Sequence, residues 1–195
     1  MKEIGIIPSI RETYKSQFEF SYDIKINKIL KSIFKKSRIF CLDFNSNLNT
    51  KTDLIIICGG NDLPFIIKSK ANLIRYKLNN IIYKKAIKQN IPMLGICYGA
   101  QYLAHKFNCK FKNKKHVGEH KVYLIKEKKF IKVNSYHNTI IRKIGKKLKV
   151  RGYAEDKSIE YFTHENKKIV GIQWHPERYQ KLKKIDLKII SSICN

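Results

Sequence analysis

The sequence predicts an α/β fold in which a mostly parallel sheet is covered by helices on both faces. In the first half of the chain, short apolar runs alternate with longer stretches whose apolar residues recur at helical spacing, as expected for parallel strands joined by crossover helices. Beyond residue 110, strand-like segments follow one another and form a β-rich second half. No repeat or low-complexity linker divides the 195 residues, so we expect one domain over 1–195.

Each element of the first half is expected from its local pattern. The segment EIGIIP (3–8) is a short apolar run that predicts the first strand, and RIFCL (38–42) predicts another. DLIIICGG (53–60) reads as a buried strand that ends in a glycine turn. The spacing of apolar residues predicts amphipathic helices over 20–36 and 69–89.

The next elements surround residue 97 and lead into the second half. PMLGIC (92–97) predicts a strand, and GAQYLAHKF (99–107) predicts the helix that follows it. Later strands are expected at 120–125, 130–136, 148–154, 159–163 and 169–174, and a helix is expected over 179–193. Few helical stretches separate the later strands, which is why the second half is predicted to be β-rich.

The chain is strongly basic, with 41 Lys and Arg residues against 15 Asp and Glu residues and a net charge of +26. Such a field attracts polyanions. However, the lysines are spread along the whole chain and form no compact run with interleaved aromatics, so we expect neither a nucleic-acid nor a membrane partner. Two origins of the charge stay open, namely compositional bias and a preference for anionic small molecules.

The cysteines indicate a reduced protein without a metal. There are five of them, at positions 41, 58, 97, 109 and 194, and no pair forms a CxxC. This argues against a disulfide framework and against a structural zinc site, and we expect neither a metal nor a cofactor. The first residues lack a signal-peptide pattern, and no apolar run reaches the ~18–20 residues of a membrane helix. We therefore expect a cytoplasmic protein.

The stretch PMLGICYGAQYL (92–103) places Cys97 where a strand ends and a helix begins. Its G-x-C-x-G spacing is the thiol counterpart of a nucleophile elbow, in which two glycines allow a tight turn. N–H dipoles at the helix start then favour the thiolate. The alternative is a buried core cysteine, the interpretation we give to Cys58, which no helix follows.

A nucleophilic thiol needs a base, and the base needs an orienting carboxylate. GIQWHPER (171–178) places His175 at a strand end with Glu177 two residues on, and Pro176 stiffens the turn between them. Of the other histidines, His105 is expected in a helix and His164 in a hairpin turn. His116, His120 and His137 lie in the β-rich segment, where they are candidates for lining the site.

GICYGAQYL and GIQWHPE together resemble the class I glutamine amidotransferase superfamily, and the resemblance covers essentially the whole chain. It implies a flavodoxin-like open sheet, with Cys97 as the nucleophile, His175 as the acid and base, and Glu177 as its orienting partner. DLIIICGGND (53–62) matches the family's oxyanion turn. The implied oxyanion hole consists of backbone N–H groups of Gly59, Gly60 and Tyr98.

VNSYHNTII (133–141) most resembles the family's γ-glutamyl hydrolase branch. In the family, the position of Gln101 helps to hold the glutamyl group, and Ser135 and Tyr136 match the segment that binds its α-amino and α-carboxylate ends. For these two, a plain strand end is the alternative. His137 completes the expected substrate-binding segment. Arg11 follows the first strand, where it would pair with an anionic leaving group or face solvent.

Three functions compete at this stage. The first is a free-standing hydrolase that cleaves a γ-glutamyl amide through a thioester and releases glutamate. The second is a glutaminase subunit that delivers ammonia to a separate synthetase, and the third is a non-enzymatic nucleic-acid binder. The complete triad argues against the third. For the first, the resemblance implies a small γ-glutamyl conjugate, either nucleotide-linked, as with a cytidine diphosphoramidate leaving group, or a conjugate of a polyamine or γ-aminobutyrate.

Overall fold

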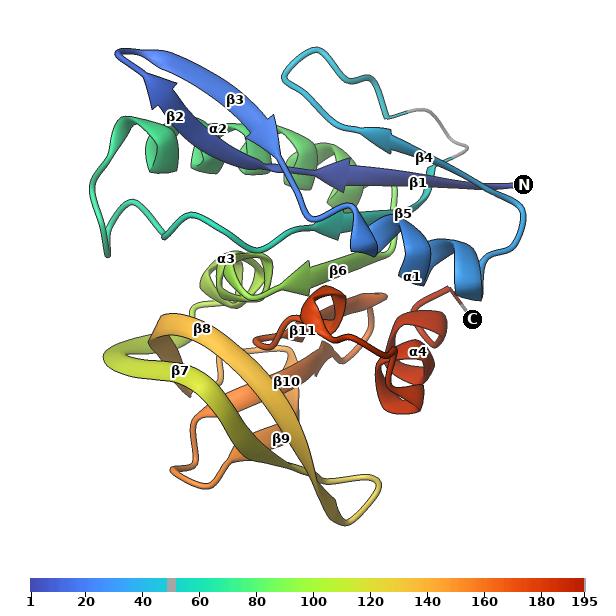
Figure 1. Ribbon diagram of the computed structural model, residues 1–195, viewed down its shortest axis with the longest axis vertical. Coiled ribbons are helices and arrows are strands. Elements are labelled where there is room, and N and C mark those ends of the chain that lie inside the picture. The colour runs from blue at the N-terminus through green and yellow to red at the C-terminus, as the bar shows by residue number, and fades with distance from the viewer. Residues whose placement is uncertain (49–51, 195) are drawn as a thin grey trace.

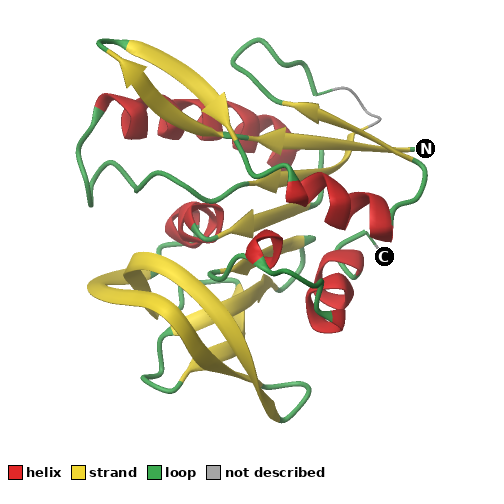
Figure 2. Ribbon diagram, viewed as in Figure 1, coloured by secondary structure: helices red, strands yellow, loops and turns green. Residues whose placement is uncertain are grey.

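The computed structural model of the chain describes residues 1–48 and 52–194. Within them, one nine-stranded sheet has the strand order β4-β1-β5-β6-β11-β10-β8-β7-β9. Helices flank the end of this sheet that carries β1, whereas the other end consists of strands and loops (Figure 1, Figure 2). The predicted α/β fold with a β-rich second half is confirmed.

The first five strands in this order run parallel. They are β4 (Ser37–Cys41), β1 (Lys2–Ile7), β5 (Thr52–Ile57), β6 (Met93–Ile96) and β11 (Ile169–Ile172). Numbered along the chain, their spatial order is 2-1-3-4-5, the flavodoxin-like arrangement, in which sites form at the carboxyl ends of the strands.

Helices cover both faces of the parallel strands. α1 (Lys25–Ile33) and α4 (Lys184–Ser191) pack on one face, and α2 (Lys70–Lys88) and α3 (Tyr98–Lys106) pack on the other. In β5, Leu54 and Ile56 contact the first pair of helices while Ile55 and Ile57 contact the second. Because successive strand residues point to opposite faces, both faces must be apolar, which explains the uninterrupted run LIII.

The other end of the sheet is antiparallel. It comprises β7 (Lys110–Leu124), β8 (Lys129–Lys143), β9 (Leu148–Ala154) and β10 (Ile159–His164), with β10 joined to β11. β7 and β8 form a long hairpin that extends well beyond the strands predicted at 120–125 and 130–136. The extra length of β7 is mostly exposed and rich in lysine, so backbone pairing rather than an apolar pattern maintains it.

Two helix predictions require correction. Residues Gln17–Ser21 form strand β3, which pairs with β2 (Ser9–Tyr14), and α1 begins only at Lys25 rather than at residue 20. The β2–β3 hairpin is largely exposed, so it carries no buried alternation that would signal strands. The helix predicted over 179–193 is confined to α4, and a short 3₁₀ turn, η1 (Pro176–Arg178), precedes it.

In the part of the chain that the structure describes, no helix combines the length and the apolar character needed to cross a membrane.

Candidate active site

The carboxyl ends of β1, β5, β6 and β11 point to the same side of the molecule (Figure 1). The turn at Gly59 follows β5, Cys97 follows β6, and His175 lies just beyond β11. A Cβ built on Gly59 would lie 2.5 Å from Cε1 of His175 and 3.4 Å from Cβ of Cys97. Three segments far apart in the sequence therefore meet at one point.

Cys97 occupies a strained turn between β6 and α3. Its φ of 50° and ψ of −106° are outside the regions that non-glycine residues favour, and its N–H donates to the Ile172 carbonyl at 2.8 Å. A Cβ on Gly95 would lie 2.4 Å from backbone atoms of Gly99, and one on Gly99 would lie 2.0 Å from the Ile57 carbonyl oxygen. Both glycines of the G-x-C-x-G spacing are thus required by backbone packing, as in a nucleophile elbow.

His175 lies between Cys97 and Glu177. Its Nδ1 donates to Glu177 Oε1 at 2.6 Å, and its ring also interacts by hydrogen bonding with the Cys97 thiol. His175 and Glu177 are buried, with 1% and 3% of their surface exposed. Because Pro176 starts the 3₁₀ turn η1, the imidazole and the carboxylate two residues later face each other. The carboxylate fixes the proton on Nδ1 and leaves Nε2 for proton exchange.

The surroundings of His175 favour its charged form. Burial lowers the pKa of the imidazole, but its interactions with Cys97 and with the Glu177 carboxylate outweigh burial and raise this pKa to about 9. At neutral pH the ring therefore holds a proton that it can pass to a departing nitrogen. This arrangement of thiol, imidazole and carboxylate is suited to acyl transfer through a thioester.

Asn134 of β8 clamps the backbone of His175 and was missed by the sequence-based prediction. Its Oδ1 accepts from the His175 N–H at 2.8 Å, and its Nδ2 donates to the His175 carbonyl at 2.9 Å. The Asn134 N–H in turn donates to the hydroxyl of Tyr179 at 3.1 Å. Asn134 precedes Ser135 in the segment that the resemblance singled out, but nothing in the local sequence shows that its amide reaches a residue 41 positions away.

The Arg75 side chain of α2 hydrogen-bonds to the backbone next to the turn after β5. Its Nη2 donates to the carbonyls of Ile7 at 3.3 Å and Cys58 at 2.9 Å, and its guanidinium lies 4.8 Å from the centre of the Tyr98 ring. Arg75 is fully buried. It therefore ties together the ends of β1 and β5 and the start of α3, the helix that follows Cys97.

Gly59→Ala is expected to lower kcat by about 10²-fold, because the new methyl group would displace the His175 ring by a fraction of an ångström or more. Steady-state kinetics on a γ-glutamyl amide would measure this loss. Gly152→Ala in β9 is the matched control. Its Cβ would also be tight, at 3.1–3.2 Å from Val122, Leu124 and the Tyr123 carbonyl, but none of these is a predicted site residue, so kcat should stay near that of the parent. Unchanged kcat in Gly59→Ala would contradict the placement of His175.

The comparisons with known proteins agree with this geometry. The sequence model of the family described as glutamine amidotransferase class-I matches residues 17–188. The chain belongs to the class I glutamine amidotransferases. Over 161 residues it is 37% identical to the γ-glutamyl-CDP-amidate hydrolase of Campylobacter jejuni, and this alignment covers 80% of each protein. With this relative and the family match, the chain is assigned as a hydrolase acting on carbon–nitrogen bonds.

One further sequence and one solved structure are similar to this amidotransferase. The chain is 30% identical over 154 residues to the glutamine-hydrolyzing GMP synthase of Ehrlichia canis, covering 72% of this chain and 28% of that protein. The crystal structure of a glutamine amidotransferase from Thermotoga maritima matches with a TM-score of 0.67 at 18% identity, over 90% of this chain and 76% of that chain. This structural match supports the fold.

The structure shows only some of the predicted substrate-binding residues of this amidotransferase next to His175. The Tyr136 ring lies 5.6 Å from the His175 ring, and the Arg178 guanidinium lies 4.4 Å from the centre of the Tyr136 ring. Ser135 is buried, and its Oγ has no hydrogen-bond partner among the described residues. Gln101 Nε2 donates to the Thr139 carbonyl at 3.0 Å, which anchors α3 to β8. Tyr136 and Ser135 therefore stay candidates.

The side chain of His137 is buried beside Glu160 of β10 together with His116. Its part in substrate binding stays a prediction. Arg11 lies in β2, on the wall of a cleft of about 340 Å³ that His175, Glu177, Gly60 and Arg178 also line. Arg11 thus faces a space next to the triad, as a residue that contacts a leaving group would.

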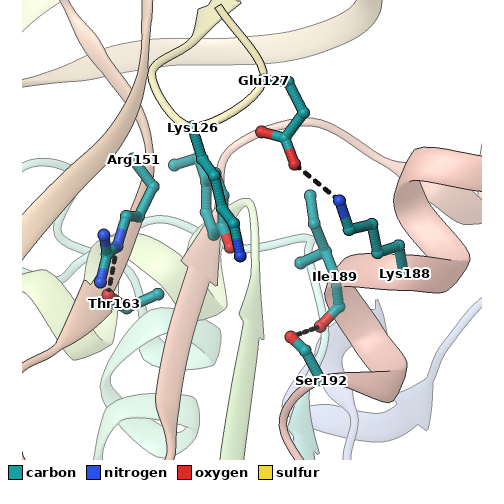
Figure 3. A pocket seen from close by; sticks show the side chains of 8 residues that line it. Lys126, Glu127, Arg151, Thr163, Lys188, Ile189 and Ser192 are labelled. Atoms are coloured by element: carbon teal, nitrogen blue, oxygen red, sulfur yellow. Dashed lines mark hydrogen bonds and ion pairs between the residues drawn. The ribbon is translucent and has the colours of Figure 1, made fainter.

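A second cleft, of about 210 Å³, lies between the β7–β8 turn, β9, β10 and α4 (Figure 3). Two of its three basic residues already have partners. Lys188 pairs with Glu127 at 3.0 Å, and Arg151 Nε donates to Thr163 Oγ1 at 2.9 Å. None of the predicted site residues lines it, so the cleft next to His175 is the candidate substrate site of the amidotransferase.

Proposed function

We propose that this class I glutamine amidotransferase hydrolyses the γ-glutamyl amide bond of a small γ-glutamyl conjugate and releases glutamate with an amine or amide. The observation that carries the proposal is the buried Cys97–His175–Glu177 arrangement at the strand ends. The sequence match to a γ-glutamyl-CDP-amidate hydrolase supports a conjugate rather than free glutamine as substrate.

In the proposed mechanism, the Cys97 thiolate attacks the γ-carbonyl carbon and the carbonyl oxygen becomes an oxyanion. Backbone N–H groups of Tyr98 at the start of α3 and of the Gly59–Gly60 turn stabilise this charge. His175 then donates its proton to the leaving nitrogen as the C–N bond breaks, which leaves a γ-glutamyl thioester. In the second half, His175 takes a proton from water, hydroxide adds to the thioester, and the thiolate departs from glutamate.

The cleft beside His175 supports a leaving group that carries phosphate. Arg11 and Arg178 line this cleft from opposite elements, the β2–β3 hairpin and η1. Guanidinium groups bind phosphate oxygens through paired hydrogen bonds, and the net charge of +26 adds long-range attraction for an anion. The two arginines support a phosphate-bearing leaving group, and the similarity to a γ-glutamyl-CDP-amidate hydrolase leads us to propose that this group is cytidine diphosphoramidate.

This substrate proposal predicts a ranking among conjugates. The chain should show its highest kcat/KM on γ-glutamyl-CDP-amidate, with lower values on γ-glutamyl polyamine, γ-glutamyl-aminobutyrate and glutamine. Arg178→Ala should raise KM for the phosphorylated conjugate about 10-fold, the equivalent of one charge-assisted hydrogen bond of roughly 1.5 kcal/mol. The exposed Arg142→Ala is the matched control. Equal turnover of glutamine and the phosphorylated conjugate would refute the substrate proposal and leave the triad intact.

A second candidate is a glutaminase subunit that supplies ammonia to a separate synthetase. The similarity to a glutamine-hydrolyzing GMP synthase, of which this chain spans only 28%, favours this alternative. It predicts slow hydrolysis of glutamine by the isolated chain and a strong increase when the synthetase is added. The conjugate assay above separates the two candidates, because a free-standing hydrolase reaches full rate alone.

A further inference from the structure

Three histidines and a glutamate from three antiparallel strands meet in the β-rich half of the fold. His116 and His120 lie on β7, His137 lies on β8, and Glu160 lies on β10. Ligand atoms of His116, His137 and Glu160 all lie within 4.8 Å of one another. The β7–β8 register pairs His116 directly with His137, and His120 follows on the same face of β7.

The cluster holds charge that the described residues leave unsatisfied. The Glu160 side chain is fully buried and the His137 side chain is 3% exposed. Within the described residues, neither carboxylate oxygen of Glu160 and neither ring nitrogen of His137 makes a hydrogen bond. A buried carboxylate costs several kcal/mol unless positive charge lies beside it, and the three imidazoles near Glu160 supply such charge only when they are protonated. A cation among these atoms would remove that cost.

The tautomer of His116 places a second hydrogen-bond acceptor beside Glu160. Its Nε2 lies 3.1 Å from Asp156 Oδ2, and because an ionised carboxylate only accepts, Nε2 carries the proton. In the neutral ring, Nδ1 then presents a lone pair to Glu160 Oε1 at 3.4 Å. Two acceptors facing each other across this distance need a positive centre between them.

The spacing of the ligand atoms fits a tetrahedral ion. Glu160 Oε1 lies 3.4 Å from His116 Nδ1 and 3.7 Å from His137 Nε2, and Glu160 Oε2 lies 3.7 Å from His120 Nε2. Ligands bound at about 2.0–2.1 Å around tetrahedral zinc lie roughly 3.3–3.4 Å apart. These three carboxylate–imidazole separations are within a few tenths of an ångström of that value. The ring nitrogens of His116 and His137 lie within 4.8 Å of each other, so binding an ion would draw these two rings together.

The residues around the cluster also match a metal site. Asp156 accepts from the far nitrogen of His116, the carboxylate–histidine–metal relation that fixes the ring and its tautomer. Lys114 pairs with the same Asp156 oxygen and holds that carboxylate in place. Three imidazoles and one carboxylate favour Zn²⁺ over Mg²⁺ or Ca²⁺, which prefer oxygen ligands.

We propose that His116, His137 and Glu160, with His120 at the second carboxylate oxygen, bind one Zn²⁺ ion that fastens β7 and β8 to β10. This departs from the expectation of a chain without a metal. That expectation rested on cysteine spacing, whereas these ligands are spread over more than 40 residues and three strands.

The site would position the catalytic residues rather than join the chemistry. His137 lies three residues after Asn134, whose amide clamps the His175 backbone. The Glu160 carbonyl accepts from the Gln173 N–H at 2.9 Å, and Gln173 lies two residues before His175. An ion that fastens β8 to β10 therefore holds both backbone segments that set the position of His175.

The test is metal binding by the full chain. After treatment with a chelator, titration with Zn²⁺ should reach one ion per chain by calorimetry and elemental analysis, and should raise Tm. Co²⁺ in its place should give the strong visible absorption of a four-coordinate site, a readout that needs no variant to fold. Glu160→Gln and His137→Ala should abolish stoichiometric binding, and Asp156→Asn should weaken it by about 10–100-fold.

His105→Gln is the matched control, because His105 lies on α3, where its ring contacts Tyr76, and this variant should bind Zn²⁺ as the parent does. Substoichiometric Zn²⁺ without a four-coordinate Co²⁺ spectrum would overturn the proposal and assign the positive centre to protons on the histidines. Equal binding by Glu160→Gln and the parent would overturn it in favour of surface histidines.

Discussion

Cys97→Ala is expected to lower kcat by about 10⁴–10⁶-fold, the range seen when the nucleophile is removed from a triad whose members act as a unit. The substitution removes the sulfur that forms the proposed thioester and leaves the His175–Glu177 pair and the oxyanion turn in place. Single-turnover kinetics on the best conjugate would measure the loss. Intact-mass analysis of the parent, quenched during turnover, should show a γ-glutamyl adduct that Cys97→Ala lacks.

Cys109→Ser is the matched control for this experiment. Cys109 is also a buried free thiol, but it lies beyond α3, where its Sγ accepts from the Gly145 N–H at 3.1 Å. A serine keeps an acceptor at that position, so kcat should stay within about twofold of the parent. If Cys97→Ala retained a substantial part of the parent rate while Cys109→Ser lost it, the covalent mechanism at Cys97 would be wrong.

The parallel half of the fold could be predicted because its burial pattern is simple. A strand covered on both faces needs apolar residues at every position, and LIII in β5 shows this directly. The β2–β3 hairpin and the outer part of β7 could not be predicted, because backbone hydrogen bonds maintain them while most of their side chains are exposed. The apolar spacing predicted α2 itself, but not which of its side chains are buried. Leu73 and Ile81 are exposed, whereas Arg75 is buried against two carbonyls.

Some residues of the candidate site could likewise be predicted from the local sequence, and others could not. Cys97 could be placed because the elbow is a local device, with glycines two residues to either side that the backbone packing requires. His175 and Glu177 were likewise marked by their own turn. Asn134 and the histidine–glutamate cluster act through partners on other strands, so only the strand order and register bring them together. Local sequence thus predicted the proposed reacting groups but missed the residues that hold them.

Glu177→Gln is expected to lower kcat by about 10⁴-fold at neutral pH, because the amide would present an N–H to Nδ1 and favour the wrong tautomer of His175. The variant also changes the pH profile. In the parent, the rate should fall as pH rises through about 9, where the His175 imidazolium loses the proton that the leaving nitrogen needs. Without the Glu177 carboxylate, one of the interactions that raise the pKa of His175 is lost, so this limb should move to lower pH.

The raised pKa of His175 also makes the stability of the fold depend on pH. Because the folded chain holds the His175 proton more tightly than the unfolded chain, whose imidazole has a pKa near 6.5, the stabilisation is complete below pH 6.5 and disappears as pH rises through about 9. Urea unfolding at a series of pH values should show this loss in the parent and a smaller one in Glu177→Gln. The exposed Glu155→Gln should behave as the parent in both assays. If the rate of Glu177→Gln fell at the same alkaline pH as the rate of the parent, the Glu177 carboxylate would not raise the pKa of His175. The assignment of Glu177 as the orienting residue would then be wrong.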